Sequence, residues 1–329
     1  MECIKRKIVS WCVLLSICSL LYSCDEDKII TENELKAVAP IEEVVSDGIK
    51  IENGYLNFES VSAFESLLGS DNADKKISLL QKVKSSKTYV TWGDSFASQD
   101  LELSLNGRTS IDDEILEDEF LSSVMNQDGI LKIGEHWFKI MYRDKIVLAL
   151  HEDNQTAYND LLKANIDNSA IMKFSTNDEV LTLLEEGSTG TMTNGRVQGL
   201  FCKEKNAEPD SDPDVYPYGD GYRLKCELNY TSLGVYFKLR AKVTNQIKNL
   251  GIWMGQQGSL RIEFFADYKP KCRDWVTKQG NVYEFYDNEL KRIPYEATRA
   301  LHKYTYRAKF YNQASSDAVS RLHEIKYGM

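Results

Sequence analysis

The sequence predicts two folded parts, an α+β N-terminal domain followed by an all-β antiparallel sandwich C-terminal domain. Two observations support this prediction. Apolar residues in the first part mix helix-like and strand-like spacings, whereas several segments beyond residue 195 place them at every second position. Charge divides at the same place, with 33 acidic against 15 basic residues over 24–195 and 22 basic against 16 acidic residues over 196–329. The two parts are therefore expected to have different surfaces.

The first 23 residues have the order of a secretory signal. Basic residues at 5–7 precede an apolar run of 14 residues, Ile8–Leu21, and Cys24 follows soon after. At about 1.5 Å per residue this run is too short to span a hydrocarbon layer of about 30 Å. Leu21 at −3 and Ser23 at −1 fit lipoprotein processing better than ordinary signal cleavage, although Tyr22 is bulky for this position. We predict that residues 1–23 are removed and that Cys24 is the lipid attachment site.

Residues 24–50 carry many charges, and most of this stretch lacks apolar periodicity, which predicts a lipid-anchored tether. The acidic run Asp25-Glu26-Asp27 fits two interpretations. It resembles the export tag that sends outer-membrane lipoproteins of Bacteroidetes to the cell surface, and it equally fits a solvated spacer.

The predicted α+β domain spans residues 51–186. Ser60 can cap a helix, because its hydroxyl can accept a hydrogen bond from the first turn. Helices are expected after Ser60, from Asp74, over Ile111–Met125, over Thr156–Ala164 and around Val180–Leu184. Strands are expected at Ile130–Ile133, Trp137–Tyr142, Ile146–Leu150 and near Ala170–Phe174.

Residues 187–195 are rich in Gly, Ser and Thr and are predicted to be a linker. The predicted β-sandwich domain spans 196–329 and ends in a C-terminal helix that Ser316 can cap, with Val319, Leu322 and Ile325 facing inward. The strands with the clearest alternation are 235–243, 260–268 and 303–311, joined by Tyr222–Tyr230 and Leu250–Met254.

Three segments resemble uncharacterised surface lipoproteins of Bacteroidetes. They are Gly54–Glu59 (GYLNFE), Met125–Gly134 (MNQDGILKIG) and Ser232–Phe237 (SLGVYF). The resemblance covers most of the chain after residue 23. It implies an exported, anchored protein with an all-β C-terminal domain, and it supplies no catalytic residue.

Cysteine placement predicts a disulfide in the C-terminal part. Once the signal is removed and Cys24 is acylated, Cys202, Cys226 and Cys272 remain. An oxidising envelope would allow two of them to pair, and the sequence leaves all three pairings open. A nucleophilic dyad of Cys272 with His302 is disfavoured, because neither residue lies in a recognisable catalytic motif.

Metal and cofactor binding have weak support in the sequence. Asp210, Asp212 and Asp214 alternate in an expected loop, as calcium ligands often do. An EF-hand would need Gly at the sixth place and a carboxylate at the twelfth, where this chain has Val215 and Gly221. We therefore expect no cofactor and keep irregular calcium binding as a weak alternative to a solvated acidic loop.

No enzyme signature stands out. The sequence contains no GxSxG, HExxH or phosphate-binding glycine loop. Paired carboxylates for glycoside hydrolysis remain open, because many acidic residues are present. The acidic run at 112–114 is explained by its place at an expected helix start.

Aromatic and basic residues of the predicted sandwich are the better candidates for binding, because exposed Trp and Tyr stack on sugar rings and anchor interfaces. Core packing is the alternative for each aromatic residue, and a solvated face is the alternative for the cations. The predicted ligand-binding residues are Trp253, Trp275, Tyr283, Tyr286, Tyr236 and Arg240, with Phe285 nearby. A basic outward face is expected from Lys238, Arg240, Lys242, Arg307 and Lys309, beside Tyr236 and Tyr311.

These observations predict a binding or adhesion lipoprotein of the bacterial outer membrane, with the sandwich binding a glycan or a protein. An envelope hydrolase acting on glycan or peptide and a structural subunit of a surface assembly are the two alternatives. The expected partners are the membrane, through the anchor, and that ligand. The acidic N-terminal half and the exported address argue against nucleic acid.

Overall fold

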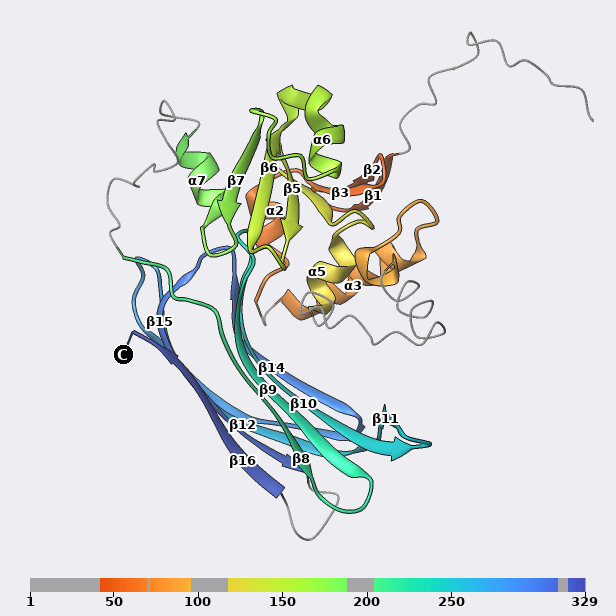
Figure 1. The fold of residues 1–329 in the computed structure, drawn as a ribbon, viewed down its shortest axis with the longest axis vertical. Helices are drawn as coiled ribbons and strands as arrows, with labels where there is room; N and C mark the ends of the chain where they lie inside the picture. The colour runs from red at the N-terminus through yellow and green to blue at the C-terminus, as the bar shows by residue number, and fades with distance from the viewer. Residues whose placement is uncertain (1–41, 70–71, 96–117, 188–203, 313–318, 329) are drawn as a thin grey trace, which may run out of the picture. The chain divides into compact units, whose positions relative to one another are not determined.

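Strands dominate the computed structural model, which describes residues 42–69, 72–95, 118–187, 204–312 and 319–328 (Figure 1). The chain divides into two units, Met1–Pro40 and Ile41–Met329, and every described residue belongs to the second. Cys24 and the predicted 187–195 linker, apart from Gly187 at a helix end, lie outside the described residues. No described helix is long and apolar enough to cross a membrane.

The N-terminal half contains a seven-stranded sheet in the order β1-β2-β3-β4-β5-β6-β7. All neighbours are antiparallel except β3 and β4, which are parallel. The strands are β1 (Glu42–Ser46), β2 (Ile49–Glu52), β3 (Tyr55–Phe58), β4 (Ile130–Ile133), β5 (His136–Met141), β6 (Ile146–His151) and β7 (Ile171–Ser175).

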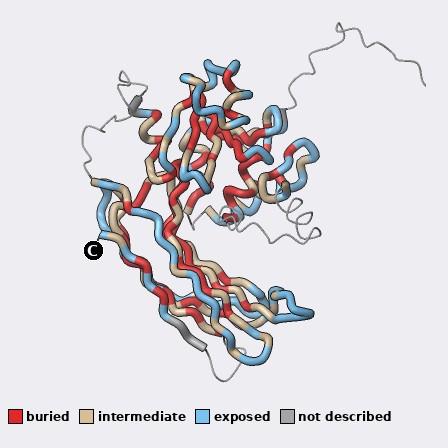
Figure 2. Tube along the Cα trace, viewed as in Figure 1, coloured by how far each residue is buried: buried red, intermediate tan, exposed pale blue. Residues whose placement is uncertain are grey.

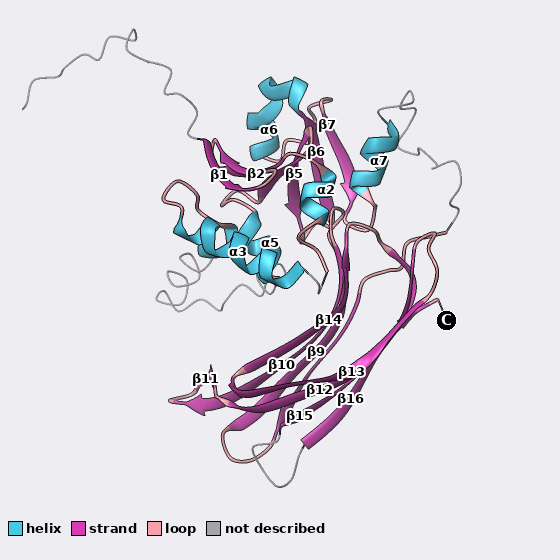
Figure 3. Cartoon of the chain, turned by 180° about the vertical axis from the view of Figure 1, so that it is seen from behind, coloured by secondary structure: helices cyan, strands magenta, loops and turns pink. Residues whose placement is uncertain are grey.

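The described helices all accompany this sheet (Figure 3). They are α2 (Val61–Glu65), α3 (Ala73–Ser85), α5 (Glu119–Val124), the 3-10 helix η3 (Glu152–Ala157), α6 (Tyr158–Leu162) and α7 (Val180–Gly187). The Ser60 side chain caps α2 as predicted, accepting a hydrogen bond from Ala63 N at 3.1 Å.

The tether predicted over 24–50 is wrong at its C-terminal end, because residues 42–46 and 49–52 form the first two strands. Val45, Ile49 and Ile51 are buried in the N-terminal core. These three apolar side chains lie on the core-facing side of a hairpin. The free energy gained by burying them against the sheet favours strands here, although charged residues surround them in the sequence.

The C-terminal half contains two antiparallel sheets. In the first sheet β8 (Asp210–Pro217), β9 (Tyr222–Ser232) and β10 (Phe237–Asn249) pair in sequence, and β11 (Ile252–Gly255) and β14 (Glu289–Ala297) both pair with β10. The second sheet has the order β13-β12-β15-β16, with β12 (Gly258–Pro270), β13 (Val276–Asp287), β15 (Leu301–Asn312) and β16 (Val319–Tyr327).

Alternating apolar residues from both sheets form one core, as the sequence predicts for a sandwich. Leu239, Ala241 and Val243 of β10 face this core, as do Ile262 and Phe264 of β12. Figure 2 shows buried and more exposed residues alternating along these long strands.

The predicted C-terminal helix is wrong, since Val319–Tyr327 is a strand paired with β15. Ser316, its expected cap, lies outside the described residues. Leu322 is exposed, whereas His323 and Ile325 are buried two residues apart. Val319, Leu322 and Ile325 fit a helical spacing, but the edge of β15 offers a full ladder of backbone hydrogen bonds, which favours the strand.

The two halves meet at the connection between β9 and β10. Leu233, Val235 and Tyr236 are buried in the N-terminal core rather than in the sandwich core. Gly234 between them has φ +77°, and its carbonyl accepts a hydrogen bond from Val180 N at 3.0 Å. A Cβ at this position would lie 2.6 Å from Cγ2 of Val147, so only glycine fits.

We predict that Gly234→Ala destabilises the protein more than Gly54→Ala does. Both glycines have positive φ, but a Cβ on Gly54 would meet no atom within 4 Å. Each variant should lose about 1–2 kcal/mol from the left-handed backbone, and Gly234→Ala should lose about 1–3 kcal/mol more from overpacking. Urea unfolding of both variants measures the difference, and equal losses would contradict the close packing of the two halves.

Candidate functional site

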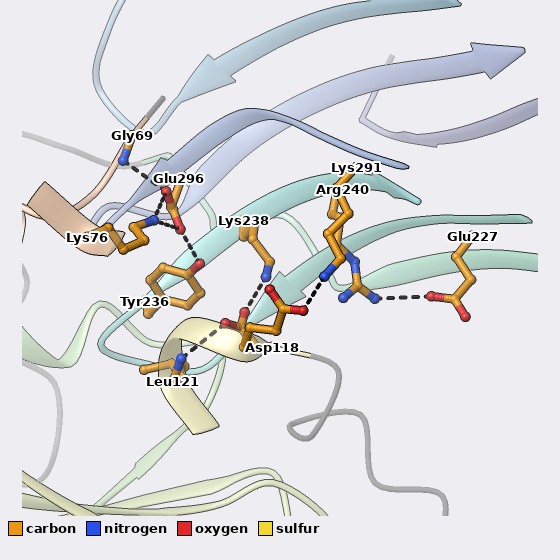
Figure 4. A network of polar contacts seen from close by, with 11 residues as sticks. Gly69, Lys76, Asp118, Leu121, Glu227, Tyr236, Lys238, Arg240, Lys291 and Glu296 are labelled. Carbon is orange, nitrogen blue, oxygen red and sulfur yellow. Dashed lines mark hydrogen bonds and ion pairs between the residues drawn. The ribbon is translucent and has the colours of Figure 1, made fainter. Parts of the chain in front are cut away.

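A network of buried charges lies where α3 and α5 meet the first sandwich sheet (Figure 4). Strand β10 places Phe237, Leu239 and Ala241 toward the sandwich core, so Lys238 and Arg240 point to the opposite face. That face is covered, because both side chains are almost fully buried.

Asp118 is the first centre of this network. It is the N-cap of α5 and accepts a hydrogen bond from Leu121 N at 3.1 Å, and it forms a buried ion pair with Lys238. Burial, the largest single effect, would raise the pKa of Asp118. The charge and hydrogen bond of Lys238, the hydrogen bond from Leu121 N and the charge of Arg240 together outweigh burial and lower the pKa below its ordinary value. Arg240 lies close behind and bonds Glu227 at 3.2 Å (Figure 4).

Glu296 of β14 is the second centre. It accepts hydrogen bonds from Lys76 Nζ at 2.6 Å, from Tyr236 Oη at 2.5 Å and from Gly69 N at 3.0 Å. These donors come from α3, from the β9–β10 connection and from the segment after α2. One buried carboxylate therefore ties three segments together.

A cavity of about 170 Å³ lies among these residues. Its charged lining pairs internally, since Asp118 and Glu296 each bind a lysine and Lys291 bonds Glu119 at 2.7 Å. Buried charges that neutralise one another make a structural joint, and Asp118, Glu119 and Glu296 are each paired with a lysine.

Tyr236 and Arg240 are therefore not a binding surface, contrary to the sequence prediction. Their exposed fractions are 0% and 3%. Lys238 is equally buried, and Lys242 is partly buried and pairs with Glu289 at 3.0 Å. The alternation of β10 was predicted correctly, but the spacing of one strand does not reveal that another part of the chain covers its polar face.

Asp118, Glu296 and Lys76 were not among the site residues predicted from the sequence. Asp118 lies inside the helix expected over Ile111–Met125, between Glu117 and Glu119, and nothing in the sequence distinguishes it from these neighbouring acids. The sequence feature that could have indicated the buried network is the concentration of cations on one face of a strand. If that face is covered, buried carboxylates are needed opposite it.

Exposed apolar side chains gather at the opposite end of the sandwich, which we call the distal tip. It comprises the β8–β9, β10–β11 and β13–β14 turns and the strand ends beside them. Seven of the fourteen exposed large hydrophobic side chains among the described residues belong to it, namely Tyr222, Leu250, Ile252, Met254, Tyr283, Phe285 and Tyr286.

Backbone hydrogen bonds from β10 hold the three turns of the distal tip side by side. Lys248 N donates to Gly221 O at 2.7 Å, and Asn245 N donates to Asn288 O at 2.8 Å. The Asn245 side chain also donates to Gln256 O at 2.9 Å. The turns are thus presented on a fixed scaffold, as binding loops usually are.

The predicted aromatic residues divide between the two ends of the sandwich. Tyr286 is 83% exposed and Leu250 is 97% exposed at the tip, while Trp253 is partly covered by the Arg223 guanidinium, 4.0 Å from its ring centre. Trp275 is exposed but precedes β13, whose opposite end carries Tyr286. At about 3.3 Å per residue these two lie roughly 36 Å apart along the strand.

The outer face of the second sheet keeps part of the predicted basic surface. Arg307 is exposed, and Lys309 lies with its ammonium 5.1 Å from the ring centre of Tyr311. Arg261 lies between Tyr311 and Tyr283, at 4.7 and 5.1 Å from the two ring centres. This stacked row leads from the middle of the sheet toward the distal tip.

The two cysteines among the described residues, Cys226 and Cys272, do not form a nucleophilic site. Cys226 is a free thiol in the sandwich core, and burial raises its pKa. Cys272 is disulfide-bonded, and Cys202 lies outside the described residues. Because Cys272 is in a disulfide, a dyad with His302 has no thiol to activate, and His302 bonds the carbonyl of Lys205 at 2.8 Å.

The weak calcium candidates Asp210, Asp212 and Asp214 lie on strand β8, not in a loop. Alternate residues of a strand are about 6.6 Å apart, so the three carboxylates spread along β8 instead of converging. Asp212 approaches His323 Nδ1 at 3.0 Å, and Asp214 accepts a hydrogen bond from Tyr216 at 2.5 Å. No cluster of three or more metal-ligating side chains occurs in the described parts of the chain.

No protein-family model matches the chain, and none of the curated proteins matches it significantly. Among solved structures, a DUF4848 family protein from Bacteroides thetaiotaomicron VPI-5482 is similar over 87% of this chain and 100% of that one. Its sequence identity is 10% and its TM-score is 0.21.

We predict that Lys238→Ala destabilises the protein by about 3–5 kcal/mol, because it leaves Asp118 buried without its partner. The matched control is Arg307→Ala, which removes an exposed pair with Glu324 at 3.3 Å and should cost at most about 1 kcal/mol. Guanidinium unfolding measures both changes.

The double variant Asp118→Asn/Lys238→Met removes both charges and keeps a side-chain oxygen to cap α5. It should recover much of the stability that Lys238→Ala loses, because neither group is left as an unpaired charge. If Lys238→Ala and Arg307→Ala cost the same, the network does not join the two halves.

Proposed function

We propose that this protein is a lipid-anchored binding protein of the bacterial outer membrane that contacts a partner protein through its distal tip. The observation that supports binding at the tip is the gathering of Leu250, Ile252, Met254, Phe285 and Tyr286 on turns at one end of the sandwich. Exposed apolar patches of this kind are uncommon unless they bind something.

The chemistry of the tip favours a protein over a glycan. Leu250, Ile252 and Met254 are aliphatic, and aliphatic side chains offer no flat face for stacking on a sugar ring. Trp253, the residue best suited to stacking, has Arg223 over its ring. A mixed aromatic and aliphatic patch with cations around it has the composition of a protein interface core.

The geometry supports binding better than hydrolysis. The acidic groups of the buried network are neutralised by Lys76, Lys238 and Arg240, and the tip turns present apolar side chains. A glycosidase needs two carboxylates separated by about 5–10 Å across an accessible cleft. The hydrolase and structural-subunit alternatives have no comparable support among the described residues.

The length of β10 is suited to presenting the tip away from the N-terminal half. The strand begins at Phe237, next to the buried Tyr236, and ends at Asn249. Thirteen residues in a strand cover about 40 Å. A binding surface at that end stays clear of the seven-stranded sheet, whose first strand follows the predicted tether.

We predict that Leu250→Ser/Ile252→Ser/Tyr286→Ser abolishes partner binding without unfolding the protein, because all three side chains are exposed. Val90→Ser/Ile166→Ser, which changes two exposed apolar residues of the N-terminal half, is the matched control. Beads carrying each purified protein are incubated with envelope proteins of the producing bacterium, and bound proteins are quantified by mass spectrometry.

Proteins held by the wild type and the control, and lost from the tip variant, are the expected result. A tip variant that retains the same proteins would reject the tip as the binding surface. A glycan array run with the same three proteins addresses the alternative ligand, and glycan binding lost only from the tip variant would replace the protein partner with a sugar.

We predict that Cys24→Ser releases the protein from the membrane. A diacylglyceryl and an acyl chain on one cysteine bury many methylene groups, at about 0.8 kcal/mol each, which makes anchoring effectively permanent. Labelling with radioactive palmitate followed by membrane fractionation should give a labelled membrane protein for the wild type and an unlabelled protein for Cys24→Ser. Equal labelling of the two would rule out Cys24 as the lipid site.

A further inference from the structure

Strand β13 is an unprotected edge of the second sandwich sheet. It lies at one end of the order β13-β12-β15-β16 and pairs with β12 alone among the described strands. Its ladder with β12 runs from Val276 to Phe285 without a bulge, and its sequence contains no proline. The backbone groups along the free side of such an edge have no partner in their own sheet, so a long flat edge is a template for pairing with another strand.

The other edges of the sandwich are protected. Strand β8, at the end of the first sheet, contains three aspartates and two prolines, and β14 contains Pro294. Strand β11 has only four residues. Strand β16 carries three charged residues within nine, Arg321, Glu324 and Lys326. Charges, proline and short length keep natural edge strands from pairing, so β13 is the edge best suited to receive another strand.

The two charges on the regular part of β13 are placed symmetrically. Between Val276 and Phe285 the charged side chains are Lys278 and Glu284, each three residues from Asn281. If the β13 strand of a second copy pairs antiparallel about Asn281, Lys278 of each copy lies directly opposite Glu284 of the other. A two-fold axis repeats every contact, so this register forms two such pairs, and opposite charges at directly opposed positions stabilise a strand pair.

Both charges are available for this contact. Glu284 is exposed. The Lys278 ammonium donates a hydrogen bond to Pro294 O at 2.9 Å and keeps further N–H groups for a carboxylate. A shift of the register by two residues in either direction would place each charge opposite an uncharged residue. The charge pattern therefore favours one register of self-pairing.

The same register pairs the exposed aromatic side chains of β13. Phe285, which is 61% exposed, would lie opposite Thr277 of the second copy, and aromatic and β-branched residues form favourable cross-strand pairs. Tyr283, which is 45% exposed, would lie opposite Gln279. The aromatic residues near the tip of one copy would thus lie near Trp275 of the other.

We propose that two copies of this chain associate through antiparallel pairing of their β13 strands about Asn281. The four-stranded second sheets of the two copies would then form one continuous sheet of eight strands. The pairing involves two copies of this chain and does not rest on the partner protein proposed for the distal tip.

Cysteine cross-linking tests the register of this pair. Asn281 is exposed, and in the proposed pair its two copies face each other with Cα atoms about 4.5–5.5 Å apart, within the range of a disulfide. Asn281→Cys in the full chain should therefore give a disulfide-linked dimer when intact cells of the producing bacterium are treated with a mild oxidant. Non-reducing electrophoresis measures the linked fraction, and the wild type gives the background from the native cysteines.

Thr277→Cys is the matched control. Thr277 is also exposed and lies on the same face of β13, but in this register its two copies are about 26 Å apart along the strands. This variant should stay at the wild-type level. Equal cross-linking of the two variants, cross-linking of neither, or linkage of Asn281→Cys to a different protein would each overturn the proposal.

Charge reversal tests the contribution of Lys278 and Glu284. Glu284→Lys should weaken association about tenfold, because it replaces two attractive cross-strand pairs with two repulsive ones. Lys278→Glu/Glu284→Lys restores opposite charges in the same register and should recover most of the affinity. Sedimentation equilibrium of the purified full chains in a density-matched detergent measures the three dissociation constants. A wild type that is monomeric at every concentration, or a double variant as weak as Glu284→Lys, would contradict self-pairing in this register.

Discussion

The buried ion pair between Lys238 and Asp118 joins α5 to β10, and the arrangement of the two halves depends on it. Lys238 lies on the face of β10 that points away from the sandwich core. Its ammonium group must therefore either stay in water or be paired with a buried carboxylate. Asp118 covers it and at the same time caps α5 through Leu121 N. Glu296 completes the joint by bonding Lys76 and Tyr236. Loss of either partner would leave a buried unpaired charge, which is strongly destabilising. The ion pairs therefore favour one relative placement of α5 and β10.

The two ends of the sandwich both depart from the usual pattern of buried apolar and exposed charged side chains. Charged groups such as Lys238 and Arg240 are buried at the end near the seven-stranded sheet, and apolar groups such as Leu250 and Tyr286 are exposed at the other end. Burial of the charges is compensated by pairing, so it has a structural explanation. Exposure of the apolar groups has no such compensation among the described residues, which supports a role in contacting another molecule.

The sequence predicted those features that depend on local pattern. The alternation of 235–243, 260–268 and 303–311 gave β10, β12 and β15, and Arg307 and Lys309 proved accessible as expected. It failed where a second element decides the outcome. Lys238 and Arg240 are buried because α5 lies over them, and Val319–Tyr327 is a strand because β15 offers an edge. Neither outcome can be predicted from the spacing of apolar residues within one segment. Tyr283 and Tyr286 are exposed, and their part in ligand binding stays a prediction.

Strand β9 runs from the junction of the two halves to the distal tip. Asn229 and Thr231 line a cleft of about 430 Å³ beside the β5–β6 turn, Glu227 bonds Arg240 in the buried network, and Arg223 stacks on Trp253 at the tip. Eight residues separate Thr231 from Arg223, which is about 26 Å along the strand. Sites that far apart with no shared partner contribute independently to binding and stability. A change in the cleft is therefore not expected to alter the proposed binding at the tip, unless the buried network between them moves. Because that network consists of paired charges, movement would require breaking several ion pairs at once, and the cleft and the tip should respond to mutation separately.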